Sequence, residues 1–355
     1  MNTAIPIIDG HNDTLLRLYR SSKEKDFSFI TGADRGHLDL PKAVQGNLGG
    51  GFFAIYTPSP AKRPQRYPGT DGENSKGYEL PLPEPLELSY AQQFTLGMAA
   101  RLFQLEKEGQ GRLKIVRAVS EMEQCLKNGT FAMIFHIEGA GAIDTDLDML
   151  HVLYEAGLRS LGITWSRPTI FGYGVPFKFP SSPDTGDGLT EAGFRLVKAC
   201  NELGILIDLS HLNEKGFWDV EHTSNAPLVA THSGVHNLCP SARNLTDKQI
   251  DAVGQSGGII GVNFHVGFLR KDGANNADTP LSDIVAHATY IVDRIGIEHV
   301  ALGSDFDGAT MPNELGSAAG LPKLMQAFSD AGYDEAALRK IAHENWVRVL
   351  GSTWK

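Results

Sequence analysis

The sequence predicts an α/β fold, and within that class a (β/α)8 TIM barrel. Short apolar runs alternate with helical patterns along 355 residues, which is typical of parallel βα units. No strand is followed by a Gly-rich dinucleotide-binding fingerprint, so an open doubly wound sheet is disfavoured. The length exceeds the roughly 250 residues of a typical barrel, and no linker or change of composition divides the chain. We therefore expect one domain spanning residues 1–355.

The expected strands are apolar runs rich in β-branched and aromatic residues. In chain order they are Ile5–Asp9, Gly51–Tyr56, Phe131–Ile137, Ser160–Thr164, Ile205–Leu209, Leu228–Thr231, Gly258–Phe264 and Val300–Gly303, with Leu113–Val116 as a weaker ninth run. The clearest helical patterns cover Glu87–Glu108, Leu147–Glu155, Glu191–Leu203, Asp247–Gln255, Leu281–Ile295 and Glu335–Leu350. Hydroxyl side chains near several helix starts, such as Thr190 and Thr246, are suited to cap unpaired backbone N–H groups.

Three longer segments interrupt this alternation, at residues 58–85, 166–188 and 266–280. Each follows an expected strand, so in a barrel all three would lie over the C-terminal face. Long loops in that position commonly form lids and walls of the substrate site. For 58–85, which is rich in Pro, Gly and charge, a surface insertion without such a role is an equal alternative.

Composition and charge exclude several classes of protein. The formal net charge is −10, which argues against a nucleic-acid partner because such a partner normally requires a basic face. No apolar run reaches the roughly 18 residues of a membrane span, and residues 1–13 do not resemble a signal peptide. The three cysteines are far apart and odd in number. We expect a cytoplasmic protein without disulfides and without a membrane partner.

Side chains that bind metals stand at the ends of five expected strands. These strand ends contain His11 and Asp13, His136 and Glu138, Asp208 and His211, His232, and Asp305 and Asp307. The C-terminal ends of barrel strands converge on one rim, where the active sites of barrels lie. Buried imidazoles and carboxylates are costly unless they are paired or bound to metal. Their conjunction provides the nitrogen and oxygen ligands that one or two divalent cations need.

Individual members of this set also have structural interpretations. A single strand-end histidine is more often a hydrogen-bonded core residue than a ligand, so only the conjunction carries the prediction. We assign His136 to the barrel layer beneath the metals, although it shares a strand face with Glu138. Asp208 is a candidate buried support, Asp307 a candidate for stabilising the turn before the next glycine, and the role of His265 in a rim loop stays open.

Competing catalytic motifs do not fit their required context. Residues 254–258 match the G-x-S-x-G pattern, but they follow an expected helix and precede an expected strand. A nucleophile elbow needs the reverse order, strand then helix. The sequence also contains no Walker A, H-E-x-x-H or C-x-x-C pattern.

Taken in order, the strand-end motifs resemble those of the membrane (renal) dipeptidase family, and specifically its soluble bacterial members. The motifs are Asp9-Gly10-His11-Asn12-Asp13, Ile137-Glu138-Gly139, Asp208-Leu209-Ser210-His211, His232-Ser233, Arg243-Asn244 and Gly303-Ser304-Asp305-Phe306-Asp307-Gly308. The resemblance runs from near the N-terminus to about residue 308. It implies a barrel of the metal-dependent hydrolase type that holds two zinc ions, with other divalent metals as alternatives.

The resemblance also implies a role for each matching residue. By analogy with the family, His11 and Asp13 bind one zinc, Glu138 bridges both ions, His211 and His232 complete the second site, Arg243 binds the terminal carboxylate of the substrate, and Asp305 is the catalytic acid and base. One position departs from the family. Trp165 stands where the mammalian enzymes carry a histidine that contacts the scissile carbonyl, and we treat it as a substrate-binding residue.

The first functional hypothesis is therefore a binuclear zinc dipeptidase. A metal-bridging hydroxide would attack the peptide carbonyl of a small dipeptide, including dipeptides with a C-terminal D-amino acid, and the family also implies a homodimer. Trp165 and the aromatic stretch 171–173 motivate a second hypothesis, hydrolysis of another small amide or ester such as an N-acyl amino acid, a lactone or a cyclic amide. The third hypothesis is a metal-binding barrel without catalytic activity.

Overall fold

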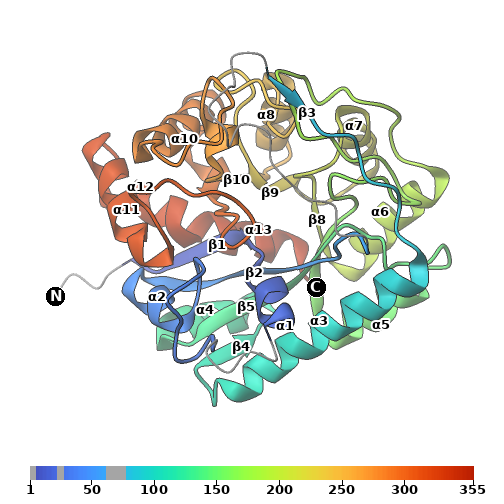
Figure 1. Cartoon of the computed structure of the whole chain (residues 1–355), viewed down its shortest axis with the longest axis horizontal. Coiled ribbons are helices and arrows are strands. Elements are labelled where there is room, and N and C mark those ends of the chain that lie inside the picture. The colour runs from blue at the N-terminus through green and yellow to red at the C-terminus, as the bar shows by residue number, and fades with distance from the viewer. Residues whose placement is uncertain (1–4, 22–27, 61–76) are drawn as a thin grey trace.

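The computed structural model describes residues 5–21, 28–60 and 77–355, which form a closed barrel of parallel strands surrounded by helices (Figure 1). The barrel strands, in their order around the ring, are β1 (Ile7–Asn12), β2 (Leu48–Tyr56), β5 (Phe131–Glu138), β6 (Leu158–Gly162), β8 (Leu206–Asp208), β9 (Val229–Ser233), β10 (Ile259–Val262) and β11 (Val300–Leu302). Parallel pairing of β11 with β1 and of β2 with β5 closes the ring. The predicted (β/α)8 barrel is confirmed.

Each of the expected strands is present, with shifted boundaries. The most consequential shift is in β1, which continues to Asn12 and so carries His11 within the strand. The weak ninth run is also a strand, β4 (Leu113–Ile115), but it lies outside the ring. It pairs with the first residues of β5, whereas β6 pairs with the last ones.

The helices cover the outside of the barrel and one of its ends. Those that match expected helices are α3 (Leu88–Glu108), α5 (Asp148–Ala156), α6 (Glu191–Leu203), α8 (Asp247–Gln255) and α10 (Leu281–Ile295). Those that the sequence analysis missed are α1 (Thr14–Arg20), α2 (Leu40–Gln45), α4 (Val119–Asn128), α7 (Glu214–Thr223), α9 (Val266–Leu269) and α11 (Leu321–Asp330). The expected continuous helix Glu335–Leu350 is instead α12 (Glu335–Arg339), a π-helical turn at Lys340–Glu344, and α13 (Asn345–Thr353).

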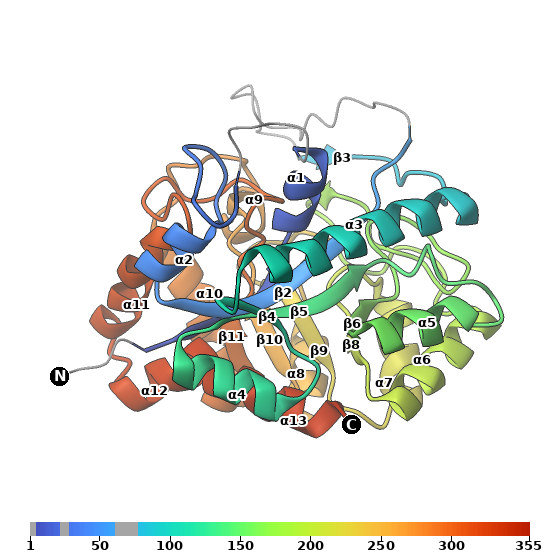
Figure 2. The same cartoon turned by 90° about the horizontal axis from the view of Figure 1, so that it is seen from below.

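The N-terminal end of the barrel is filled by a side chain from α13. The indole of Trp346 is fully buried, and its Nε1 donates a hydrogen bond of 3.2 Å to the carbonyl of Leu302. A Cβ at Gly10 would stand only 2.6 Å from the Trp346 ring, so the indole packs directly against β1 at this end of the barrel. Figure 2 shows α13 and α4 at this end, with α1 and α9 at the opposite one. The open face is therefore the C-terminal one.

Two of the expected long loops meet over that face. A two-residue strand in the loop after β2, β3 (Tyr78–Glu79), pairs antiparallel with β7 (Lys178–Phe179) in the loop after β6. Residues 61–76 of the expected loop 58–85 lie outside the described residues. Among the described residues, no helix has both the length and the apolar character needed to cross a membrane.

Candidate metal centre

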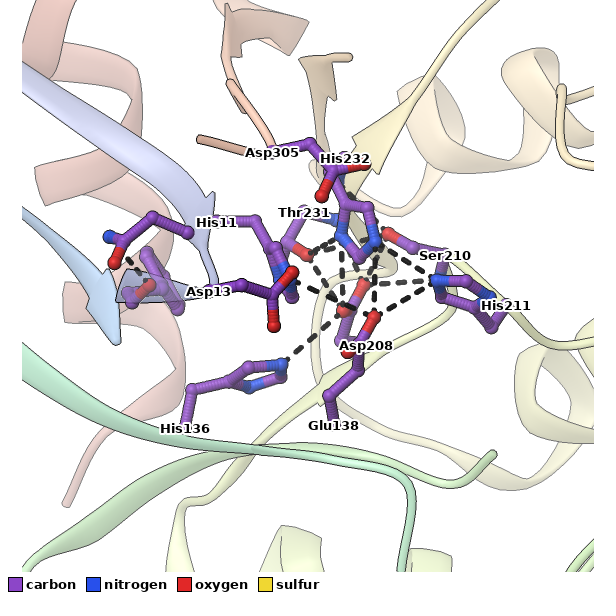
Figure 3. A network of polar contacts seen from close by, with 12 residues as sticks. His11, Asp13, His136, Glu138, Asp208, Ser210, His211, Thr231, His232 and Asp305 are labelled. Carbon is purple, nitrogen blue, oxygen red and sulfur yellow. Dashed lines mark hydrogen bonds and ion pairs between the residues drawn. The ribbon is translucent and has the colours of Figure 1, made fainter. Parts of the chain in front are cut away.

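The five residues expected to bind metal come together at the C-terminal ends of four strands (Figure 3). His11 lies in β1 and Asp13 directly after it, Glu138 ends β5, His211 follows β8, and His232 lies in β9. Glu138 is central to the arrangement. Its Oε1 lies 3.0 Å from His211 Nε2, 3.5 Å from His232 Nε2 and 3.7 Å from His11 Nε2.

These residues form two adjacent groups that share one carboxylate. His11, Asp13 and Glu138 offer ligand atoms that all lie within 4.8 Å of one another, and so do Glu138, His211 and His232. Each group contains imidazole nitrogen and carboxylate oxygen, the mixed donor set that zinc accepts. A carboxylate has two oxygens and can contact one ion with each, so the shared Glu138 is suited to join two neighbouring cation sites.

The state of these side chains also suits cations. Among the described residues, neither ring nitrogen of the fully buried His11 has a hydrogen-bond partner. Burial lowers the pKa of His211 and of His232 well below the usual value, so their nitrogens keep a lone pair for a ligand. Burial raises the pKa of Glu138 well above normal, and the nearby Asp13 and Asp305 add to this shift. His11 behaves differently: burial lowers its pKa, but Glu138 and Asp13 outweigh burial and raise the pKa to about 10. Divalent cations bound between these carboxylates would take the place of that proton and supply the positive charge.

A network beneath these groups fixes their orientation. Asp208 accepts hydrogen bonds from the backbone N–H of Ser210 (3.0 Å) and from the hydroxyl of Thr231 (2.7 Å). The Thr231 hydroxyl in turn lies 2.8 Å from Nδ1 of His232, which leaves Nε2 directed at Glu138. Asp208 is thus hydrogen-bonded as a buried support would be, but its carboxylate also forms, with His11 and His232, a third group whose ligand atoms lie within 4.8 Å of one another. Such supporting bonds set the tautomer and direction of a ligating imidazole.

His136 lies in this supporting layer. Its Nδ1 is 2.9 Å from the hydroxyl of Ser160, and its Nε2 is 3.7 Å from Asp208. Within the described part of the chain, His136 belongs to none of the groups that could hold a metal. Burial lowers its pKa to about 3, so it remains a neutral side chain beneath the cluster.

Asp305 approaches the cluster from the turn after β11. Its backbone is left-handed, with φ of 62°, and its N–H donates to the carbonyl of His11 at 2.9 Å. Asn263, after β10, donates from Nδ2 to Asp305 Oδ2 at 3.1 Å. Gly308 permits this arrangement, because a Cβ there would stand 2.0 Å from Asp13 Oδ2 and 2.5 Å from Asp305 Oδ1.

A cavity of about 240 Å³ opens above these groups and is lined by Asp13, Glu138, His211, Arg243 and Asp305, among others. The guanidinium of Arg243 is 2% exposed and donates to the backbone carbonyls of Ser210 and His232. These bonds fix the positive charge of Arg243 in the cavity, close to Glu138 and Asp305.

Aromatic side chains form one wall of this cavity. The ring centroids of Trp165 and Phe177 are 5.5 Å apart, and those of Phe177 and Phe268 are 6.3 Å apart. The guanidinium of Arg243 lies over the far ring, 5.4 Å from the centroid of Phe268. Trp165, Phe177 and Phe268 thus form an aromatic row of neighbouring rings, and Arg243 lies against Phe268. The row includes residues from two of the expected long loops, 166–188 and 266–280.

Comparison with protein families shows which family the chain belongs to. The family model described as membrane dipeptidase, peptidase family M19, matches residues 1–354. The chain belongs to this family. Its members are metallo-dipeptidases, so the chain is a metal-dependent hydrolase of peptide bonds, and the hypothesis of a barrel without catalytic activity is set aside.

Relatives in this family include proteins without an assigned activity and a solved peptidase. An uncharacterized protein from the pqqA 5′ region of Klebsiella pneumoniae is 50% identical over 72% of this chain and 94% of its own length. One from the PQQ-III 3′ region of Acinetobacter calcoaceticus is 41% identical over 82% and 90%. The crystal structure of a metallopeptidase from Rhodobacter sphaeroides, liganded with a phosphinate mimic of L-Ala-D-Ala, is 49% identical with a TM-score of 0.95, covering 99% of this chain and 100% of that one.

Sequence reasoning missed two residues whose side chains contact the candidate ligand His211 and the candidate acid and base Asp305. Ser166, whose hydroxyl lies 3.0 Å from His211 Nδ1, and Asn263, which contacts Asp305, were not singled out. Asn263 directly follows β10 and could have been found by the rule that identified the other strand ends. Ser166 lies in a loop, and no pattern in the sequence indicates that its hydroxyl meets His211.

Proposed function

We propose that this M19 peptidase hydrolyses small dipeptides with two divalent cations, zinc in the first instance. His11 and Asp13 would hold one cation, His211 and His232 the other, and Glu138 both. The observation that carries this proposal is the single Glu138 carboxylate, which two ligand groups share and which lines the cavity. We include substrates with a C-terminal D-amino acid, because the similar Rhodobacter protein binds a mimic of L-Ala-D-Ala.

Asp305 would move the proton that the reaction requires. When bound, a pair of divalent cations makes water nucleophilic near neutral pH and polarises a carbonyl oxygen. Asp305 faces the same cavity and is held by the amide of Asn263. It would accept a proton from the attacking water and return it to the leaving nitrogen, because an amine departs readily only when protonated.

Arg243 would recognise the free C-terminal carboxylate. Its guanidinium is fixed by two backbone carbonyls and lines the cavity that contains Glu138 and Asp305. A planar guanidinium suits a carboxylate, and the fixed distance from Arg243 to the cluster would favour short peptides with a free C-terminus.

The test compares zinc-loaded protein on L-L and L-D dipeptides with the same dipeptides blocked as C-terminal amides. We expect hydrolysis of the free dipeptides and much slower hydrolysis of the amides. Arg243→Ala should lower kcat/KM for free dipeptides by roughly 100-fold, the usual scale for a buried charged contact, and affect the amides much less. Hydrolysis of no dipeptide by metal-loaded protein would contradict the proposal.

A second candidate substrate is another small amide, in particular an N-acyl amino acid. The aromatic row that ends at Trp165 favours it, because such a wall can hold an acyl group as well as an amino-acid side chain. Both substrates carry a carboxylate for Arg243 and differ in the free amine. Faster turnover of N-acetyl amino acids than of dipeptides would favour this second candidate.

A further inference from the structure

A second cavity adjoins the proposed substrate site. It measures about 220 Å³, and Glu138 and Trp165 line both it and the cavity above the metal-binding residues. Its other walls include the apolar Leu86, Ile143 and Ile170, and also the charged Asp144 and Arg167. Because Trp165 contributes to both cavities, its indole forms part of the wall between them.

The indole of Trp165 is held firmly in this wall. It is 9% exposed, and its ring centroid lies 4.8 Å from that of Tyr56. The guanidinium of Arg167 lies 5.5 Å from the indole centroid and donates to the carbonyl of Thr57 at 2.9 Å and to the hydroxyl of Ser59 at 2.7 Å. A large side chain entering from the substrate site would have to displace this packed group.

The orientation of a bound dipeptide places its N-terminal residue near this wall. With the terminal carboxylate at Arg243 and the peptide carbonyl near Glu138, the N-terminal residue lies on the side away from Arg243. Trp165 and Glu138 line both cavities, whereas Arg243 lines only the one above the metal-binding residues, so we expect the N-terminal residue to meet Trp165. The second cavity lies just beyond it.

We propose that Trp165 is a specificity-determining residue, which closes the second cavity to substrate and restricts the N-terminal side chain of the dipeptide to small ones. The proposal rests on the proposed dipeptidase function. It implies that a smaller side chain at position 165 joins the two cavities. The second cavity then becomes a subsite for large apolar side chains such as those of Leu and Phe.

A matched variant can fill the second cavity from a different lining residue. Gly141 lines this cavity, and a Cβ there would meet nothing closer than Leu86 at 3.8 Å and Ala91 at 4.0 Å. Gly141→Leu therefore adds volume without a backbone clash. It touches none of the residues proposed to bind metal or substrate in the natural protein.

The experiment measures kcat/KM of zinc-loaded protein for Ala-Ala, Leu-Ala and Phe-Ala, together with its metal content. The natural protein should favour Ala-Ala. Trp165→Ala should raise the ratio of Leu-Ala or Phe-Ala to Ala-Ala by about tenfold or more, the scale on which a pocket discriminates between side chains of different size. Trp165→Phe, a milder change, should shift this ratio in the same direction.

Adding Gly141→Leu to Trp165→Ala should return the ratio toward the natural value, while Gly141→Leu alone leaves the ratio unchanged.

The outcomes separate this inference from the function on which it rests. Ratios unchanged within twofold in both Trp165 variants, with metal bound and Ala-Ala still hydrolysed, would overturn the inference and leave the dipeptidase proposal intact. A natural preference for Phe-Ala, or a gain in Trp165→Ala that Gly141→Leu does not reverse, would also overturn it. Hydrolysis of none of these dipeptides by metal-loaded natural protein would refute the proposed function, and the inference with it.

Discussion

Asp305 is constrained in a way that suits a carboxyl group for proton transfer. The hydrogen bond from its backbone N–H to the carbonyl of His11 ties it to the strand that carries one candidate ligand. Burial raises the pKa of its carboxyl, although the positive charge of His11 and the amide of Asn263 oppose the shift. A carboxyl with a raised pKa exchanges its proton closer to neutral pH than an ordinary aspartate does.

Asp305→Asn should therefore abolish most turnover while leaving the metals bound. Asp305 is absent from the metal-binding groups found among the described residues, and asparagine keeps nearly the same shape. We expect kcat on a dipeptide to fall by about 10² to 10⁴, the range for loss of a general acid or base. The check is kcat together with metal content, with Asp251→Asn on the exposed side of α8 as the control. Full activity in Asp305→Asn would show that another group moves the proton.

At the scale of single residues, the sequence predicted which candidate ligands lie close together but not which side chains hold them in place. His11, Glu138 and His232 could be placed on one rim because the geometry of a barrel brings strand ends together, however far apart they are in the chain. The side chains that hydrogen-bond to these residues lie partly in loops, and barrel geometry does not predict where loop residues lie. The bond between Ser166 and His211 joins two different loops, and its existence depends on loop conformations that sequence patterns do not specify.

At the scale of elements, the turn after β11 is the part of the scaffold most closely fitted to the site. Asp305 and Asp307 both have left-handed backbones, with φ of 62° and 66°. Asp307 holds the turn against α1, where its Oδ2 accepts from the hydroxyl of Thr14 at 2.7 Å and lies 3.0 Å from Nη2 of Arg17. Asp307 therefore ties the turn before Gly308 to α1.

Gly308→Ala should disrupt this turn and the site together. The added methyl group would stand within 2.0 Å of Asp13 Oδ2, so either the turn or the carboxylate must move. We expect activity to fall by roughly 100-fold, since a displacement of about 1 Å at a reacting centre costs that much, and metal binding to weaken. Gly351→Ala in α13 is the matched control, because its Cβ would meet nothing closer than Val119 at 3.9 Å. Unchanged activity and metal content in Gly308→Ala would contradict this account of the turn.

Long, periodic elements were predictable, and short or interrupted ones were not. α6, α8 and α10 have the predicted bounds because their apolar periodicity and flanking residues agree. α7 was missed although Asn213 caps it by accepting from the N–H of Gly216, a signal that the sequence does contain. The π-helical turn before α13 could not be read from the sequence, because the helical pattern continues through it.

At the scale of the whole molecule, the two ends of the barrel differ: one is packed with apolar side chains and the other contains the candidate functional site. Trp346 fills the N-terminal end, and the polar cluster occupies the C-terminal one. The barrel could be predicted because the chain alternates strands and helices without a linker. The second cavity could not, because its walls come from segments far apart in the sequence. We propose that the chain is a single domain, as the continuous ring of strands supports.

The fold should lose stability in mild acid through a buried histidine outside the site. His287 in α10 is 1% exposed, its Nδ1 accepts from the N–H of Val235 at 2.9 Å, and its Nε2 lies 3.0 Å from the carbonyl of Leu269. Burial lowers its pKa to about 4. Between pH 6.5 and 4 the unfolded chain therefore binds a proton that the folded chain does not.

The free energy of unfolding should thus decrease as the pH falls through this window, by up to about 3 kcal/mol from His287. His287→Gln removes the titrating group, so the stability advantage of the natural protein over this variant should shrink as the pH is lowered from 7 to 4.5. Calorimetric melting temperatures of the two proteins across that range provide the check. A difference that stays constant with pH would show that His287 does not contribute to the acid sensitivity.

The most direct test of the central claim is a titration of metal-free protein with zinc, following bound metal and dipeptidase activity together. We predict two tightly bound ions per chain and activity that reaches its maximum as the second one binds. His232→Ala should hold fewer ions, whereas His136→Leu, one layer below, should still hold both. Fewer than one bound ion per chain, or full activity in the presence of a chelator that has removed the metal, would contradict the account.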